Sequence, residues 1–453
     1  MNLPNYFLAD LPPEASLTPN MIGEACQTLK RNRELYLQHR STQSLVDLLV
    51  RVAKDWLDTE FPFRKLALAE GPGATGFSRA TLTAGLDAFF KELTVEAFHA
   101  LLEQDLGNPE RLDQFAASPA EQKANRASVA LGPEFLVHIA AGNLPNPTLM
   151  SLILGVLARS AQFVKCASGG AFLPRLFAHS LYDADHKLGA CLELAEWRGG
   201  NEPLEKALFA EATCITATGT DENLAAIRQR VPSKVRFLGY ASRLSFGYVA
   251  HEVLSGLHAR KIVERAAKDI TAWNQLGCLS PHVMYVQSGA AVSPEKFAEM
   301  LAAVMAEREA NEPRGELPVE SAAVISSRRA IYALRAAHSP DTRQWTSSGS
   351  TAWTVVYESD PRFQTSCLNR FVYVKEVKDL TNALQSADPV RGKVSTVGLA
   401  VPEHKAQEMA MELGRWGATR VCPLGQMQNP PMSWRHDGRP SLGDLVTWTD
   451  WEQ

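Results

Sequence analysis

The chain has 453 residues, of which 45% are hydrophobic and 21% are charged, so it can bury more than one core and should form two or three domains. Its formal net charge is −4, and no long block of one sign occurs, which argues against a nucleic-acid partner. The N-terminus lacks the pattern of a secretion signal, and no apolar run reaches the roughly 18 residues of a membrane span, so we expect a cytoplasmic protein.

Seven cysteines are scattered along the chain without the paired spacing of a zinc site. Their odd number also argues against a disulfide framework in a chain of this length. We therefore expect no metal site and interpret most of the cysteines as small buried hydrophobic residues. They are Cys26, Cys166, Cys191, Cys214, Cys278, Cys367 and Cys422.

The first part of the chain is predicted to be helical. Apolar residues recur at helical spacing over residues 15–60, which predicts a helical hairpin or layer. A G-x-G-x-x-G motif follows at residues 71–76, before a helical stretch at 78–106. A dinucleotide fingerprint needs a further strand that ends in an acidic residue, whereas residues 107–128 are polar and turn-rich. We therefore interpret the glycines as a turn and Ser78 as the cap of the next helix.

From about residue 130, short apolar runs alternate with helical segments. This alternation indicates a parallel sheet covered on both faces, which is a doubly wound α/β domain. The predicted strands lie at residues 135–141, 161–168, 190–200, 213–220, 234–240 and 244–250. The predicted helices between them lie near 146–160, 174–188 and 221–231.

A second α/β unit is predicted after residue 250. A helix at 258–277 ends at Gly277, and the strand at 282–287 comes next. Further helices are expected at 292–310, 378–385 and 403–416, and further strands at 350–358, 371–377 and 395–401, with a surface loop at 312–318. The tail from residue 422 is rich in Pro, Gly and Trp, so we expect it to dock on another part instead of forming a domain.

Cys278 stands between a helix and a strand, in the segment WNQLGCLSPHVMYV. A thiol at such a junction lies near backbone amides that can stabilise a developing oxyanion. A buried, unreactive thiol is the alternative interpretation of this position.

The segment around Cys278 resembles the catalytic segment of the aldehyde dehydrogenase superfamily. AAGNLPNPT, FVKCAS, TATGT, TVGLAV and GATRVCPLG resemble other segments of that superfamily in the same order. More narrowly, CLSPHVMYV, RLSFGYVA and PLGQMQ resemble the acyl-CoA reductase family of the bioluminescence fatty-acid reductase, LuxC, over about residues 70–453. The resemblance implies an aldehyde-dehydrogenase-like fold with N-terminal helices and an NADP-binding domain over 1–245, a catalytic thiol domain over 246–420, and an oligomerisation tail over 421–453.

The resemblance also implies the roles of individual residues. Cys278 would attack an acyl thioester and form a covalent thioester, while the Asn143 side chain would help to hold the oxyanion. Lys165 and Ser168 occupy the strand end where the superfamily often has a ribose-binding glutamate, which favours NADPH over NADH. Gly219 and Thr220 would meet the cofactor pyrophosphate at the start of a helix.

Plainer interpretations exist for three of these residues. In these interpretations, Asn143 is an ordinary turn residue and Lys165 is a surface lysine at a strand end. Thr220 is then only the N-cap of a helix.

The implied activity is reduction of a long-chain acyl thioester to a fatty aldehyde with NADPH. Residues 240–247 hold no carboxylate where hydrolytic superfamily members carry a water-activating glutamate, so the acyl-enzyme should persist. The acyl donor would be acyl-CoA or an acylated partner protein, with an acyltransferase and an acyl-protein synthetase as further partners and a homo-oligomer as the assembly. A short-chain CoA-acylating aldehyde dehydrogenase and a catalytically idle acyl-binding assembly protein are the alternatives.

Overall fold

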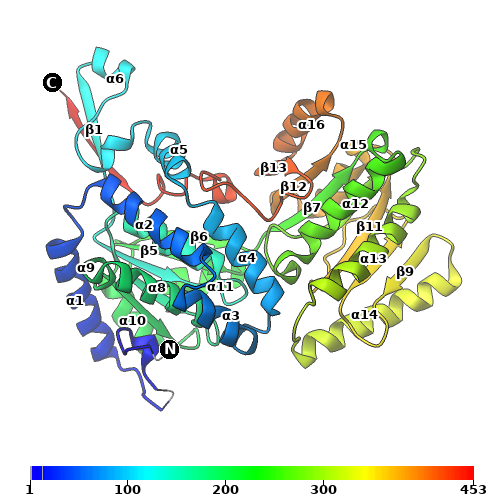
Figure 1. Cartoon of the computed structure of the whole chain (residues 1–453). Helices are drawn as coiled ribbons and strands as arrows, with labels where there is room; N and C mark the ends of the chain where they lie inside the picture. The colour runs from blue at the N-terminus through cyan, green and yellow to red at the C-terminus, as the bar shows by residue number, and fades with distance from the viewer. Residues whose placement is uncertain (1–2, 13, 453) are drawn as a thin grey trace. The chain divides into compact units, whose positions relative to one another are not determined.

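The computed structural model describes residues 3–12 and 14–452, which form two compact units (Figure 1). Unit 1 consists of the described residues of Met1–Thr75, Leu86–Ser242 and Pro431–Gln453, and unit 2 of Gly76–Gly85 and Arg243–Pro430. The C-terminal residues thus belong to the same compact unit as the N-terminal helices. Among the described residues, every helix is too short or too polar to cross a membrane.

Unit 1 is built on a five-stranded parallel sheet with the strand order β4-β3-β2-β5-β6. Its strands are β2 (Phe135–Ile139), β3 (Ala161–Cys166), β4 (Leu192–Glu196), β5 (Cys214–Gly219) and β6 (Arg236–Ala241). Its helices are α1 (Pro19–Tyr36), α2 (Thr42–Leu57), α3 (Pro62–Thr75), α5 (Val95–Leu106), α6 (Pro119–Lys123), α7 (Asn146–Leu157), α8 (Phe172–Ala184), α9 (His186–Gly189), α10 (Glu202–Glu211) and α11 (Asp221–Arg230). Helix α4 (Arg79–Lys91) contributes residues to both units.

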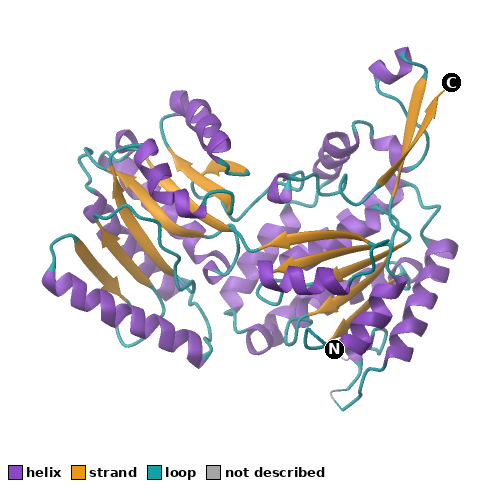
Figure 2. Ribbon diagram, turned by 180° about the vertical axis from the view of Figure 1, so that it is seen from behind, coloured by secondary structure: helices purple, strands orange, loops and turns teal. Residues whose placement is uncertain are grey.

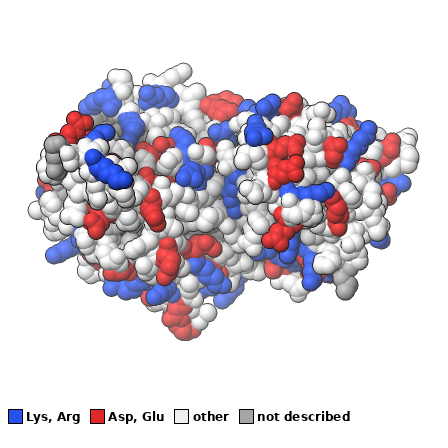
Figure 3. Space-filling model, turned by 90° about the horizontal axis from the view of Figure 1, so that it is seen from above, with Lys and Arg blue, Asp and Glu red and all other residues white. Residues whose placement is uncertain are grey.

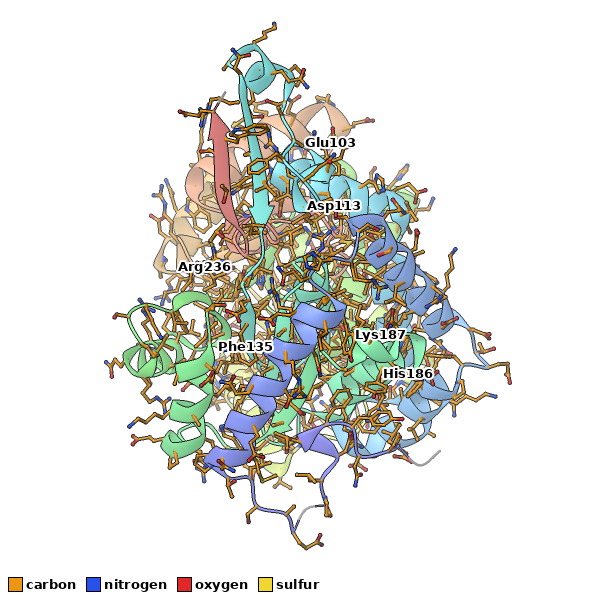
Figure 4. All side chains as sticks on the ribbon, turned by 90° about the vertical axis from the view of Figure 1, so that its left-hand side faces the viewer. Glu103, Asp113, Phe135, His186, Lys187 and Arg236 are labelled. Atoms are coloured by element: carbon orange, nitrogen blue, oxygen red, sulfur yellow. The ribbon has the colours of Figure 1, made fainter. Side chains whose placement is uncertain are left out.

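Both faces of this sheet are covered by helices, as expected for parallel strands that are apolar on both sides. Helices α1, α10 and α11 cover one face, where Phe135 lies in the core beneath the apolar side of α1. Phe135 is labelled in Figure 4, where α1 lies in the foreground. Helices α7 and α8 pack together, and α7 contacts strands β2 and β3.

The C-terminal tail docks on unit 1 through a two-stranded antiparallel ribbon. Strand β14 (Thr447–Glu452) pairs with β1 (Arg126–Leu131) along its whole length, and Figure 1 shows the two strands side by side. The Arg236 guanidinium, labelled in Figure 4, donates hydrogen bonds to the carbonyls of Leu445 and Val446 just before β14. From Pro431 onward the described part of the tail thus docks on unit 1, whereas residues 422–430 belong to unit 2.

Unit 2 contains a seven-stranded sheet with the order β13-β12-β7-β8-β11-β10-β9, shown as orange arrows in Figure 2. Strand β9 is antiparallel to its neighbour, whereas the other pairings are parallel. The strands are β7 (Leu244–Val249), β8 (Pro281–Gln287), β9 (Thr342–Thr346), β10 (Thr354–Glu358), β11 (Phe371–Val377), β12 (Val394–Ala400) and β13 (Arg420–Pro423). The helices are α12 (Gly256–Thr271), α13 (Pro294–Asn311), α14 (Val319–His338), α15 (Leu380–Ala387) and α16 (Glu403–Trp416). Buried residues of α12 and α13 form the core on one face, and those of α14, α15 and α16 form the core on the other.

Three local predictions need correction. Gly71 and Gly73 lie inside helix α3, and only Gly76, with φ 74°, makes the expected turn. The predicted helical stretch 78–106 is two helices, α4 and α5, although Ser78 does cap the first, since its Oγ accepts from the Thr81 amide at 3.1 Å. Helix α14 and strand β9 were not anticipated.

The surface charge is mixed. On the face shown in Figure 3, basic and acidic side chains are interspersed and do not gather into one patch of either sign. This distribution matches the formal net charge of −4.

Candidate active site

The candidate nucleophile Cys278 lies in a short loop of unit 2 that leads into strand β8. Helix α12 ends at Thr271, earlier than the predicted end at Gly277, and a 3-10 turn, η4 (Ala272–Gln275), follows it. Cys278 comes after this turn and is partly exposed. We call residues 272–281 the thiol loop.

The thiol loop begins with three consecutive residues in the left-handed region. Trp273, Asn274 and Gln275 have φ values of 48°, 53° and 65°. This conformation costs of order 1–3 kcal/mol for a residue other than glycine, so it persists only where the surroundings impose it. All three side chains are buried, and this burial in defined contacts is what holds the turn.

Polar side chains of the turn are tied to neighbouring backbone. The Asn274 side-chain amide donates to the Arg314 carbonyl at 2.8 Å, and that of Gln275 donates to the Pro281 carbonyl at 2.8 Å. The resemblance to the superfamily's asparagine-glutamine pair therefore has a structural explanation, since these residues fasten both ends of the loop.

The backbone next to Cys278 is also fixed. The Ser280 amide donates to the Gly277 carbonyl at 3.0 Å and closes a turn around Cys278. The Ser245 hydroxyl donates to the Cys278 carbonyl at 2.7 Å, and the Gln428 amide donates to the Ser280 hydroxyl at 3.1 Å. Neither Ser245 nor Gln428 was predicted as a site residue, because both are distant from Cys278 in the chain.

The other six cysteines differ among themselves in burial, but burial raises the pKa of each. Cys26, Cys166, Cys191 and Cys214 are buried, as predicted for most of the cysteines, whereas Cys367 and Cys422 are partly exposed, like Cys278. Burial raises the pKa of the Cys26, Cys166 and Cys191 thiols to about 12 and that of Cys422 to about 11. It also raises the pKa of Cys214 and Cys367. All six are therefore protonated and weakly nucleophilic near neutral pH.

The candidate cofactor residues lie in unit 1, at or just beyond the carboxyl ends of the parallel strands. The strand order changes direction between β2 and β5, since β3 and β4 extend the sheet to one side and β6 to the other. Ligands of open α/β sheets bind outside the carboxyl ends of the strands at such a switch point. Lys165 on β3 pairs in register with Ile139 on β2, which in turn pairs with Ala217 on β5.

Lys165 is buried, with 5% of its surface exposed, so the interpretation as a surface lysine is wrong. Its ammonium lies 5.9 Å from the ring centroid of Trp197. Desolvation lowers the pKa of Lys165, while the nearby carboxylates of Glu205 and Glu196 oppose that shift.

The remaining predicted residues occupy loops at the same edge. Ser168 is exposed in the loop between β3 and α8, and Asn143 is exposed in the loop between β2 and α7. Gly219 ends β5, and the exposed Thr220 precedes α11 and caps it, its Oγ1 accepting from the Asn223 amide at 3.2 Å. The helix-cap interpretation of Thr220 is therefore confirmed, and it leaves the hydroxyl proton able to donate elsewhere.

Three acidic residues at this edge were not singled out from the sequence. Glu196 ends β4, pairs in register with Cys166, and accepts from the Gly169 amide at 2.8 Å. Its place in the predicted strand 190–200, shortly before the turn-forming Gly199 and Gly200, was an available signal. Asp221 and Glu222 lie in the first turn of α11, where their negative charges offset the positive end of the helix dipole. The N-terminus of α11 therefore attracts a further anion less strongly.

The donors at this edge fit a dinucleotide in their topology and chemistry. A buried cation lies on β3, and a small residue and a hydroxyl lie at the end of β5. Within the described residues, no group of three or more His, Cys, Asp and Glu side chains has the arrangement of a metal site.

Two histidines near the candidate residues are structural. His138 is buried in β2 between the Thr216 hydroxyl at 2.7 Å and the Gln162 side-chain oxygen at 3.0 Å, and burial lowers its pKa to about 4. Burial also lowers the pKa of His282 to about 4, and its Nδ1 accepts from the Ser366 amide. Both rings are therefore neutral near pH 7.

Comparison with known proteins adds relatives that align with most of the chain. The family model described as acyl-CoA reductase (LuxC) matches residues 37–448. A long-chain acyl-protein thioester reductase of Aliivibrio fischeri is 23% identical over 425 residues, covering 90% of this chain and 82% of the relative. Long-chain acyl-protein thioester reductase 2 of Photobacterium leiognathi is 21% identical over 438 residues, covering 95% and 85%.

Solved structures share the fold at low sequence identity. A putative aldehyde dehydrogenase from Burkholderia cenocepacia superposes with a TM-score of 0.74 at 15% identity, covering 96% of this chain and 92% of its own. A bifunctional proline utilization A protein also gives a TM-score of 0.74 at 15% identity, but this chain spans only 46% of it. The predicted aldehyde-dehydrogenase-like α/β fold is therefore confirmed.

We predict that iodoacetamide at pH 8 modifies Cys278 faster than the other six cysteines, because its proposed role needs a reactive thiolate in a partly exposed loop, whereas burial raises the pKa of each of the other six thiols. Peptide mass spectrometry over a time course measures the rate at each site. The Cys278→Ala variant should lose the fast phase and retain the slow ones. Faster modification of Cys367 or Cys422 than of Cys278 would contradict the assignment.

Proposed function

The chain belongs to the acyl-CoA reductase (LuxC) family, and from this premise we propose that it reduces a long-chain acyl thioester to the fatty aldehyde with NADPH through Cys278. The observation that supports the proposal most strongly is the family match over residues 37–448, which includes the thiol loop. The predicted family resemblance is thereby confirmed. Relatives that align over 90% and 95% of this chain are named as long-chain acyl-protein thioester reductases, which supports the same substrate class here.

In the proposed reaction, the Cys278 thiolate attacks the carbonyl carbon of the acyl thioester. A carbon–sulfur bond to the enzyme forms, the bond to the donor sulfur breaks, and the donor leaves as a thiolate that takes up a proton. The Asn143 side-chain amide and the Cys278 backbone amide are the proposed donors to the oxyanion. Gly219, Thr220, Lys165 and Ser168 would hold NADPH, which would supply a hydride to the enzyme-bound acyl carbon. The aldehyde would then leave as its bond to sulfur breaks, which would regenerate the Cys278 thiolate.

Strand β7 supports reduction over hydrolysis. It occupies the segment where hydrolytic relatives carry a glutamate, and residues 240–247 contain no carboxylate. Without a side chain that deprotonates water, the acyl-enzyme persists until a hydride or a thiol reaches it. Oxidation of aldehydes to free acids is therefore disfavoured.

The preference for NADPH is proposed from the charge on β3. The Lys165 ammonium and the Ser168 hydroxyl would bind the 2′-phosphate of NADPH, whereas a glutamate at the end of β3 would repel it. Glu196 on the adjacent strand opposes this preference in part, but it already accepts the Gly169 amide. Gly219 and Thr220 are the proposed contacts of the pyrophosphate.

The proposed partners follow from the substrate class. The acyl donor is an acylated partner protein or acyl-CoA, and an acyltransferase and an acyl-protein synthetase would supply it. We also propose that the protein is cytoplasmic and forms a homo-oligomer. The homo-oligomer is supported by Trp448 and Trp451 on β14, which expose 44% and 50% of their surface. Exposed aromatic residues on a paired ribbon are typical of protein interfaces.

Turnover tests the proposed activity. Purified protein with NADPH and acyl-CoAs of two to sixteen carbons should consume NADPH fastest with the long chains and release the matching aldehyde. The Cys278→Ala variant should be inactive, while Cys422→Ala serves as the matched control and should retain activity. A preference for two-carbon thioesters would favour the short-chain alternative, and absence of turnover with every chain would favour the idle assembly protein.

The cofactor assignment predicts that Lys165→Ala lowers kcat/KM for NADPH by about tenfold or more and changes that for NADH by less, since a cation–phosphate contact is lost. The NADH rate of the same variant controls for misfolding, and Lys187→Ala, which removes an exposed lysine of the same unit, controls for net charge. Equal losses with NADPH and NADH would contradict the role of Lys165.

A further inference from the structure

The hydroxyl of Ser245 joins two strands of unit 2 to the thiol loop. Ser245 is fully buried near the start of β7. Its Oγ donates to the Cys278 carbonyl at 2.7 Å and accepts from the Thr396 amide of β12 at 3.1 Å. A buried hydroxyl normally has such partners, and here one partner is the backbone of the candidate nucleophile itself.

Both strands that flank β7 are irregular at Ser245. On one side, Leu244 pairs with Val394 and Ser245 with Thr396, so one residue of β12 is skipped. On the other side, Ser245 pairs with Pro281 and Phe246 with Val283, so one residue of β8 is skipped. An extra residue in a strand bends it and changes the direction in which its side chains and peptide groups point. The two irregularities coincide at Ser245, whose hydroxyl contacts the thiol loop.

The peptide groups on either side of Cys278 are held by two different hydrogen bonds. The Ser280 amide donates to the Gly277 carbonyl, which fixes the peptide group between Gly277 and Cys278. In a trans peptide the carbonyl and the following amide point in opposite directions, so this bond also sets the direction of the Cys278 amide. The Ser245 hydroxyl fixes the next peptide group through the Cys278 carbonyl.

We propose that Ser245 is a positioning residue that orients Cys278 for attack by holding its backbone through the carbonyl oxygen. The proposal rests on the proposed role of Cys278 as the nucleophile. When Ser245 loses its hydroxyl, the peptide group after Cys278 can rotate, and the Cys278 side chain then loses its fixed orientation relative to the proposed oxyanion amide, which the Ser280–Gly277 bond still holds. Ser245 touches no reacting atom and acts only through Cys278.

Kinetics of three variants test this role. Ser245→Ala should lower kcat by about tenfold or more while KM for NADPH and for the acyl thioester stays within about threefold, because orientation affects the reacting geometry more than binding. Ser245→Thr retains a hydroxyl and should recover most of the lost kcat. Ser395→Ala is the matched control, since Ser395 is a fully buried serine on the adjacent strand β12 whose hydroxyl has no hydrogen-bond partner among the described residues.

Amide hydrogen exchange separates this proposal from the proposed function. In Ser245→Ala, the amides of Thr396 and of residues 276–280 should exchange about tenfold faster or more than in the wild type and in Ser395→Ala. If the wild type shows no reductase turnover, the proposed function fails, and the exchange measurement still decides whether Ser245 holds the loop. Unchanged exchange, or a Ser245→Ala kcat within twofold of the wild type in an active enzyme, would overturn the role of Ser245.

Discussion

The proposed chemistry of unit 2 depends on a backbone that is held in place at Cys278. Three left-handed residues precede the cysteine, and such a turn is held only by the contacts around it. Those contacts come from separate elements, because Gln275 fastens the loop to the start of β8 and Ser245 fastens it to β7 and β12. Placing a nucleophile before the reaction reduces the orientational entropy that the reaction would otherwise cost.

Unit 1 contributes a different constraint, which is the shared carboxyl edge of its parallel strands. This edge brings Lys165 on β3, Glu196 on β4 and Gly219 on β5 to one side of a single sheet, although long segments separate them in the chain. Burial of Lys165 weakens its hydration, so an anionic group placed beside it would interact more strongly than at an exposed lysine. The carboxylate of Glu196 at the same edge would repel such an anionic group. The proposed preference for NADPH over NADH therefore depends on the balance between the charges of Lys165 and Glu196.

Sequence patterns predicted strands β2, β3 and β8, because strands buried on both faces form continuous apolar runs. They also predicted helix α12, because its buried residues recur at helical spacing on one face. Helix α14 was missed because apolar residues such as Val324 and Leu334 face solvent and disturb its periodicity. Cys278 was identified from its neighbours in the chain. Ser245 was not, because its contact with Cys278 arises from strand irregularities that only the folded sheet defines.

The most direct test of the central claim is the mass of the intact protein after incubation with a fourteen-carbon acyl-CoA in the absence of NADPH. The account predicts an increase by one acyl group, absent in Cys278→Ala, that remains until NADPH is added and then disappears as the fatty aldehyde is released. An unchanged mass, the same increase in Cys278→Ala, or rapid loss of the acyl group to water without NADPH would contradict it.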